Sequence, residues 1–257
     1  MATSISLGSQ KWQHVTVRHV PLLRPIRWLQ AGWDDLRHIG APSLGHGALI
    51  AMLGAVLLAF GSSHPYLIAA AVSGYLLIGP IMATGLCELS RRRRAHEPLG
   101  FNESLQPISS NPHAFIRFGT VLAVIVIVWF VASEVMLRTI LHTPGPSLDE
   151  VVWGNIVTEA NRAQVIGYLA SGALLAAAVF TLSVVAVPMM IDWNASASEA
   201  IVTSARSMLR NIPAMLVWGA LIVALTAIGF LTMLIGMIVI APLLGHATWH
   251  AYRDLIE

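Results

Sequence analysis

The sequence predicts an all-α membrane protein with six transmembrane helices, arranged as three parallel two-helix repeats that each follow a cytoplasmic-side amphipathic helix. Three observations lead to this prediction. Hydrophobic residues make up 56% of the 257 residues and charged residues only 11%, against about 25% charged residues in a soluble domain. Apolar runs long enough to cross a bilayer follow one another with few polar residues between them. Prolines also recur in similar contexts, which indicates an internal repeat.

Residues 1–40 are the expected cytoplasmic tail and interfacial helix, and residues 41–257 are the expected membrane domain. The apolar residues of segment 25–39 fall near one helical face, namely Ile26, Leu29, Trp33, Leu36 and Ile39. The charged residues fall away from that face, namely Arg27, Asp34, Asp35 and Arg37. This pattern predicts an amphipathic helix that lies in the membrane interface. A soluble helix that binds a partner is the alternative.

Six apolar segments are the predicted spans, at about 43–61, 65–89, 114–137, 164–190, 211–228 and 231–250. The last two come from one apolar block, which as a single helix would be about 60 Å long, twice the roughly 30 Å hydrocarbon core. We therefore expect a tight helical hairpin that turns near Gly229 and Phe230. The span at 164–190 is rich in Gly and Ala, which predicts a place at the centre of the bundle.

The repeat is suggested by three prolines, Pro80, Pro188 and Pro242, which lie in the second arm of each predicted unit. Each proline should bend its helix, because proline removes a backbone donor and crowds the preceding turn. Two spans per unit return the chain to its starting side, so the copies would be parallel. The alternative is that these prolines are unrelated, since proline is common in membrane helices.

A second amphipathic helix is expected just before the terminal hairpin, at 199–210. Ser196 and Glu199 have the spacing of a capping box, which predicts the start of this helix.

The basic residues are distributed unevenly along the chain. All 15 Lys and Arg residues except Arg138 and Arg162 fall on one side of the predicted membrane. This positive-inside pattern places both termini in the cytoplasm. A run of four arginines follows the second span and is expected to fix the topology and contact anionic lipid headgroups, namely Arg91, Arg92, Arg93 and Arg94. A patch for nucleic acid or a partner protein is the alternative.

Glu134 is an ionisable residue within a predicted span, and such residues are functional candidates because their burial is costly. Arg138 lies four residues later on the same helical face, and both are expected near the outer interface. A structural ion pair or a snorkelling carboxylate is the preferred interpretation. Any external ligand would bind at the long external loop, about 139–163.

His246 and His250 are four residues apart on one helical face, a spacing that allows two imidazoles to chelate a divalent metal. His38 and His46 are expected at the same membrane surface. No glutamate follows His246 as a zinc-hydrolase motif requires, so structural interfacial histidines are the preferred interpretation. The sequence also lacks a phosphate-binding loop, a nucleophile elbow and a cysteine pair. We expect no cofactor and no enzymatic activity.

Three passages carry a resemblance to a known family: 20–36, 79–91 and 241–253. They resemble a bacterial family of predicted integral membrane proteins, domain-of-unknown-function family 2189. The resemblance implies a bacterial inner-membrane protein of about six spans with no established activity. Some members carry labels that connect them with cytochrome c oxidase. This sequence lacks the intramembrane histidines of a catalytic oxidase subunit, so that label points at most to an accessory role.

Three functions follow as hypotheses. The favoured one is a non-enzymatic accessory or scaffold component of a membrane complex, a respiratory complex among the candidates, because the spans are nearly uncharged. A small-solute transporter or channel would need a polar path between the repeats. A cytoplasmic-face metal-binding protein would use the histidine pair. The expected partners are the lipid bilayer, anionic lipid headgroups and a membrane protein, but not nucleic acid.

Overall fold

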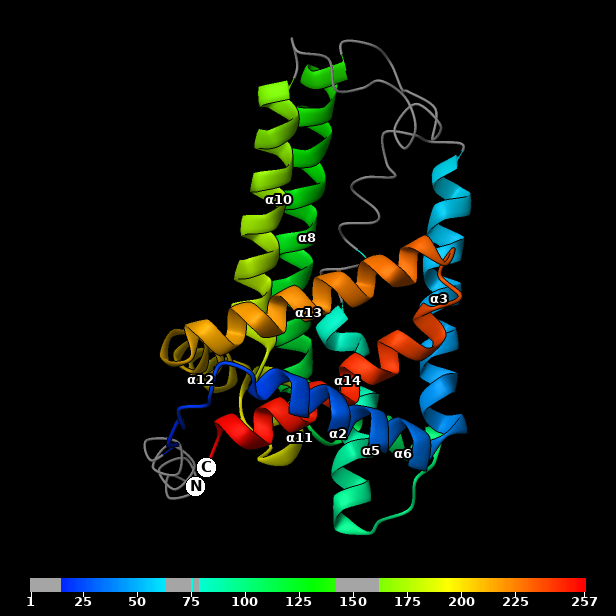
Figure 1. Cartoon of the computed structure of the whole chain (residues 1–257), viewed down its shortest axis with the longest axis vertical. Coiled ribbons are helices and arrows are strands. Elements are labelled where there is room, and N and C mark those ends of the chain that lie inside the picture. Colours follow the sequence, from blue (N-terminus) through cyan, green and yellow to red (C-terminus); the bar gives the residue numbers. More distant parts are fainter. Residues whose placement is uncertain (1–14, 63–74, 76–78, 142–161) are drawn as a thin grey trace.

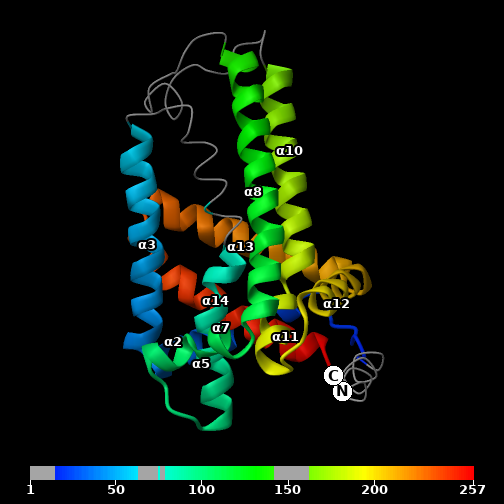
Figure 2. The same cartoon turned by 180° about the vertical axis from the view of Figure 1, so that it is seen from behind.

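The computed structural model describes residues 15–62, 75, 79–141 and 162–257, and the regular structure of these residues is helical apart from one isolated bridge. Three helices run along the long axis of the molecule, α3 (Ala41–Ser62), α8 (Pro112–Leu141) and α10 (Arg162–Ser183) (Figure 1). Three others run across that axis, α2 (Arg24–Ile39), α13 (Ile212–Leu231) and α14 (Met237–Leu255). The view from behind shows α8 and α10 side by side, away from α3 (Figure 2).

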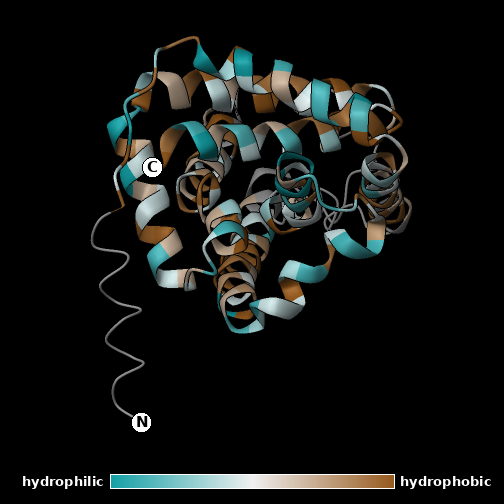
Figure 3. Ribbon diagram, turned by 90° about the horizontal axis from the view of Figure 1, so that it is seen from below, coloured by the Kyte–Doolittle hydropathy of each residue, from teal (hydrophilic) through white to brown (hydrophobic). Residues whose placement is uncertain are grey.

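Shorter helices complete one end of the molecule, which we call the base: α5 (Thr84–Ala95), α6 (Phe101–Ser104), α7 (Gln106–Ser110), α11 (Ala186–Asp192) and α12 (Ala197–Arg210). The ends of the predicted second, fourth and sixth spans meet here, since α5, α11 and α14 pack against one another. Around them, α2 packs on α14, α6 and α7 pack on α5, and α12 packs on α11. Seen from below, hydrophilic and hydrophobic residues alternate along the helices of this end (Figure 3).

Four helical segments are long and apolar enough to cross a membrane, namely Ala41–Ala59, Pro112–Met136, Ile166–Asp192 and Ile212–Leu231. They correspond to the predicted first, third, fourth and fifth spans. Most of the second span, and the external loop, lie outside the described residues. The sixth differs from expectation, because α14 begins only at Met237 and its second half is polar from His246 onward. Six spans and a threefold repeat are therefore not confirmed.

The terminal block does form a helical hairpin. Helices α13 and α14 pack against each other and are joined by residues 232–236. Met233 and Leu234 there adopt positive φ angles of 52° and 66°, a conformation that side-chain-bearing residues rarely adopt outside turns. The reversal thus lies a few residues after the expected position at Gly229 and Phe230.

The buried face of α2 differs from the predicted one. The buried residues are Pro25, Trp28, Gly32, Asp35, Leu36 and Ile39. Ile26 and Trp33, expected on the apolar face, are exposed. The assignment of Asp35 to the solvated face was therefore wrong, since it follows Trp28 by seven residues and so lies on the same helical face.

The predicted central position of the 164–190 span holds for residues 184–190, which are buried, but much of α10 is exposed. Gly167, Ala170, Ala173 and Ala177 are exposed, and spacings of three and four residues place them on one helical face. The contact with α8 uses other residues of the helix, since the Ser133 and Tyr168 hydroxyls lie 2.8 Å apart and Gly172 faces the Trp129 ring. The small residues therefore lie on an outward face, which also carries Ile166 and Leu174.

The three prolines do not act alike. Helix α10 ends at Ser183 and α11 begins at Ala186, two residues before Pro188. The freed backbone groups at this break are satisfied by α12, since the Ser204 hydroxyl accepts from Val185 N at 3.2 Å and donates to a carbonyl of α10. A turn at Ala83 separates Pro80 from α5, whereas α14 continues through Pro242.

The amphipathic helix before the terminal hairpin, α12, begins as expected. The Ser196 hydroxyl accepts from Glu199 N, and the Glu199 carboxylate accepts from Ser196 N. These two bonds complete the predicted capping box of α12.

Candidate functional site

The candidate site is a hydrogen-bonded chain of polar side chains inside the base, where α2, α3, α5 and α14 converge. His246 of α14 is fully buried, with Nε2 2.8 Å from Ser43 Oγ and Nδ1 2.8 Å from Ser90 Oγ. Ser90 donates its hydroxyl proton to Asp35 Oδ2 at 2.5 Å. Nδ1 of a neutral His246 ring must then donate to Ser90, and Nε2 accepts from Ser43.

Asp35 is the terminal acceptor of this polar network, which we define as Ser43, Ser90, Asp35, Arg93, His246 and His250. Its carboxylate also accepts from His250 Nε2 at 2.8 Å and from Arg93 at 2.6 Å. Burial alone would raise the pKa of Asp35, but the hydrogen bonds from His250 and Ser90 outweigh burial and lower it. The carboxylate is therefore ionised and links three elements, α2, α5 and α14.

Close backbone approaches bring these elements together. A side chain at Gly32 of α2 would collide with backbone atoms of Leu243 and Ala247 in α14. A side chain at Gly47 of α3 would collide with the carbonyl of Ile238. Helix α14 thus lies against both neighbours at glycine positions, which allows short side chains such as Ser43 to reach it.

The network has no reachable nucleophile. Ser43 and His246 are fully buried and Ser90 is 2% exposed, so a substrate has no contact with either hydroxyl. Their hydrogen-bonding capacity is used within the protein. The arrangement can therefore fix helices relative to one another, and within the network only His250 and Arg93 are partly exposed.

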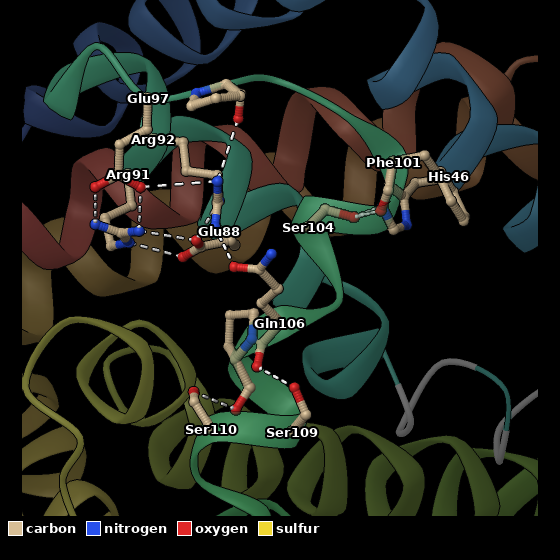
Figure 4. Close-up of polar contacts among 12 residues, drawn as sticks. His46, Glu88, Arg91, Arg92, Glu97, Phe101, Ser104, Gln106, Ser109 and Ser110 are labelled. Carbon is tan, nitrogen blue, oxygen red and sulfur yellow. Dashed lines mark hydrogen bonds and ion pairs between the residues drawn. The ribbon is translucent and has the colours of Figure 1, made fainter.

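The four candidate metal-ligand histidines do not form one ligand set. Among the described residues, no three His, Cys, Asp or Glu side chains are placed to hold a metal ion together. His46 instead bonds Ser104 Oγ at 2.8 Å and stacks on Phe101 (Figure 4). His38 is exposed. The version with three ligands is thus not supported, and metal binding by the His246 and His250 pair alone stays a prediction.

Most of the arginine run is occupied by carboxylates of the chain itself. Glu88 accepts from Arg91 Nε at 2.7 Å and from Arg92 Nε at 2.6 Å (Figure 4). Arg91 also pairs with Glu97, and Arg93 pairs with both Asp34 and Asp35. Arg94 differs, because it is exposed and no hydrogen bond or ion pair joins it to a described residue. Headgroup contact therefore remains a prediction chiefly for Arg94.

The ion pair between Glu134 and Arg138 within the membrane stays a prediction. Glu134 lies partly exposed near the far end of α8 from the base and has an interaction partner. The Arg138 side chain lies outside the described part of the chain.

Asp35, Ser43 and Ser90 were not singled out from the sequence as site residues. The signal for Asp35 was its spacing from Trp28 and Gly32 on the buried face of α2. The two serines carry no comparable signal, because each is a single small polar residue whose partner is distant in the chain.

Comparison with known proteins gives one family. Residues 67–192 match a family described as "Predicted integral membrane protein (DUF2189)". This match confirms the family resemblance, although two of the three passages that suggested it, 20–36 and 241–253, lie outside the matched range. Neither curated proteins nor solved structures gave a match.

Proposed function

Because residues 67–192 belong to a family of predicted integral membrane proteins, we propose that this chain is a non-enzymatic accessory or scaffold component of a membrane complex. The complex lies in the bacterial inner membrane, and respiratory complexes are among the candidates. The observation that carries the proposal is the outward face of small residues on α10.

Small residues at the surface of a membrane helix favour contact with another helix, because they let two backbones approach closely. The face defined by Gly167, Ala170, Ala173 and Ala177 is exposed, and a side chain added at Gly167 would meet nothing within 4 Å. Large residues are exposed on both helices, Ile127 and Val128 on α8 and Ile166 and Leu174 on α10. The small residues between Ile166 and Leu174 would let a partner helix approach α10 closely, so we take α10 as the helix that a partner protein covers.

The polar residues support a structural role over catalysis or transport. The hydroxyls of Ser43 and Ser90 and the ring of His246 are enclosed within the base, so a substrate does not reach these groups. On the long helices, three hydroxyls bond to their own helix: Thr120 donates to Ile116 O, Thr181 to Ala177 O, and Ser183 to Val179 O. Side chains bonded in this way do not supply a connected polar path for a solute.

We also propose the six-span topology with both termini in the cytoplasm. The two ends of the described chain lie side by side, since Arg18 N donates to Leu255 O at 2.8 Å. An even number of crossings is required to bring them to one membrane surface. The packing of each amphipathic segment on the second arm of the preceding unit, with α2 on α14 closing the ring, supports a threefold repeat.

Site-specific photocrosslinking in native membranes tests the accessory role. A photoreactive phenylalanine analogue at Ala170 should give a discrete product with a second, different protein. The same analogue at Val128 of α8 is the matched control and should give no such product. Equal labelling at both positions, or a product that contains only two copies of this chain, would reject the proposal.

A further inference from the structure

A pocket of about 750 Å³ opens beside the polar network on the base. Its walls come from α2, α5, α14 and the two ends of the described chain. Five arginines line it together with two acids, a net charge of +3 when His250 is neutral, namely Arg18, Arg24, Arg27, Arg94, Arg253, Asp254 and Glu257. Trp28 and Trp193 complete the wall.

Three of these arginines already have carboxylate partners. Arg24 binds both oxygens of Asp254, at 2.6 and 3.0 Å. Arg18 pairs with Glu257, and Arg253 bonds to Asp192 through one terminal nitrogen at 3.1 Å. Both acids of the pocket are thus neutralised.

The remaining basic groups have unused donors. Arg27 and Arg94 make no hydrogen bond or ion pair with any residue of the described chain. The Nε atom of Arg253 is buried and has no acceptor there. A buried donor without an acceptor is costly, and two unpaired guanidinium groups from separate helices on one concave surface repel each other. An anion in the pocket would relieve the repulsion between Arg27 and Arg94.

We infer that this pocket binds a phosphate group, held between Arg27 of α2 and Arg94 of α5, with Arg253 as a third donor. The planar guanidinium presents paired N–H donors that match two phosphate oxygens, so a pocket of arginines favours phosphate over anions without paired oxygens. The phosphate comes either from an anionic phospholipid headgroup or from a soluble phosphate compound. The inference does not rest on the accessory role, since it uses different residues and a different surface.

Titration calorimetry on the purified full chain in detergent, at constant ionic strength, tests the pocket. The probes are inorganic phosphate, short-chain phosphatidylglycerol below its micellar concentration, and short-chain phosphatidylcholine as the zwitterionic control. The Arg27→Ala/Arg94→Ala variant should weaken binding about tenfold or more, because each lost arginine removes charge-assisted bonds. Arg27→Lys/Arg94→Lys keeps the charge without the paired donors and should weaken it less.

The matched control is Arg206→Ala/Arg210→Ala, which removes two exposed arginines of α12 outside the pocket. It should leave binding within about twofold of the unchanged protein, because exposed charges outside the pocket act through screened solvent. If phosphatidylglycerol binds and inorganic phosphate does not, the ligand is a lipid headgroup. If inorganic phosphate binds, the phosphate group alone is sufficient for binding. Equal affinity for phosphatidylcholine, equal weakening in the control variant, or binding of neither probe would overturn the inference.

Discussion

Replacing Asp35 by Asn should destabilise the base far more than the same change at its neighbour Asp34. Both carboxylates bind Arg93, at 2.6 and 2.7 Å, but the Asp35 side chain is 6% exposed and that of Asp34 is 71% exposed. Breaking a buried ion pair by removing one partner costs about 3 to 5 kcal/mol. An exposed pair contributes at most about 1 kcal/mol.

The two variants form a matched pair on one helix turn, with the same substitution and the same arginine partner. At about 2 to 4 °C per kcal/mol, D35N should lower the unfolding midpoint by roughly 6 to 20 °C and D34N by at most about 4 °C. Intrinsic tryptophan fluorescence during heating in detergent measures both midpoints, since the buried Trp28 and Trp218 report on the base. Equal shifts in the two variants would refute the view that Asp35 links the helices.

Three further outcomes are expected. Gly47→Ala should lower the unfolding midpoint, since overpacking costs about 1 to 3 kcal/mol, whereas Gly219→Ala, with nothing within 4 Å, should be neutral or stabilising. The pKa of Asp35 is lowered in the fold. The ionised carboxylate therefore stabilises the folded protein at pH values above the ordinary pKa of aspartate, and this stabilisation is lost as the pH falls through the pKa of the folded state. Midpoints should therefore drop below about pH 4, and less so in D35N. Reporter fusions after Ala95 should report the cytoplasm and those after Gly229 the opposite side; the reverse result would contradict the proposed topology.

Local features of the fold could be predicted because they depend on residues close in sequence. The capping box of α12 needs only Ser196 and Glu199, three positions apart. The terminal hairpin follows from the length of one apolar block. His246 and His250 share one face of α14, as their spacing requires, although His246 is fully buried and not interfacial.

The remaining features depend on which surfaces meet. Composition marks α10 as rich in small residues but does not say whether the face of Gly167 and Ala170 packs inward or points outward. The two acids of α2 differ only by one helical step, yet one is buried and the other is exposed. The serines that bind His246 come from α3 and α5, so only the assembled base brings them together.

The central position of α14 has a consequence for biogenesis. This helix packs against α2, α3 and α5, yet it is synthesised after all of them. While the chain is being made, the earlier helices can insert into the bilayer, but the glycine surfaces and polar groups that will face α14 have no partner. The base must therefore assemble late, from contacts between distant parts of the chain. A nascent chain stopped before Met237 would contain all four candidate spans, but Ser43 would lack its partner His246 and Asp35 would lack His250, which makes the chain a substrate for membrane quality control.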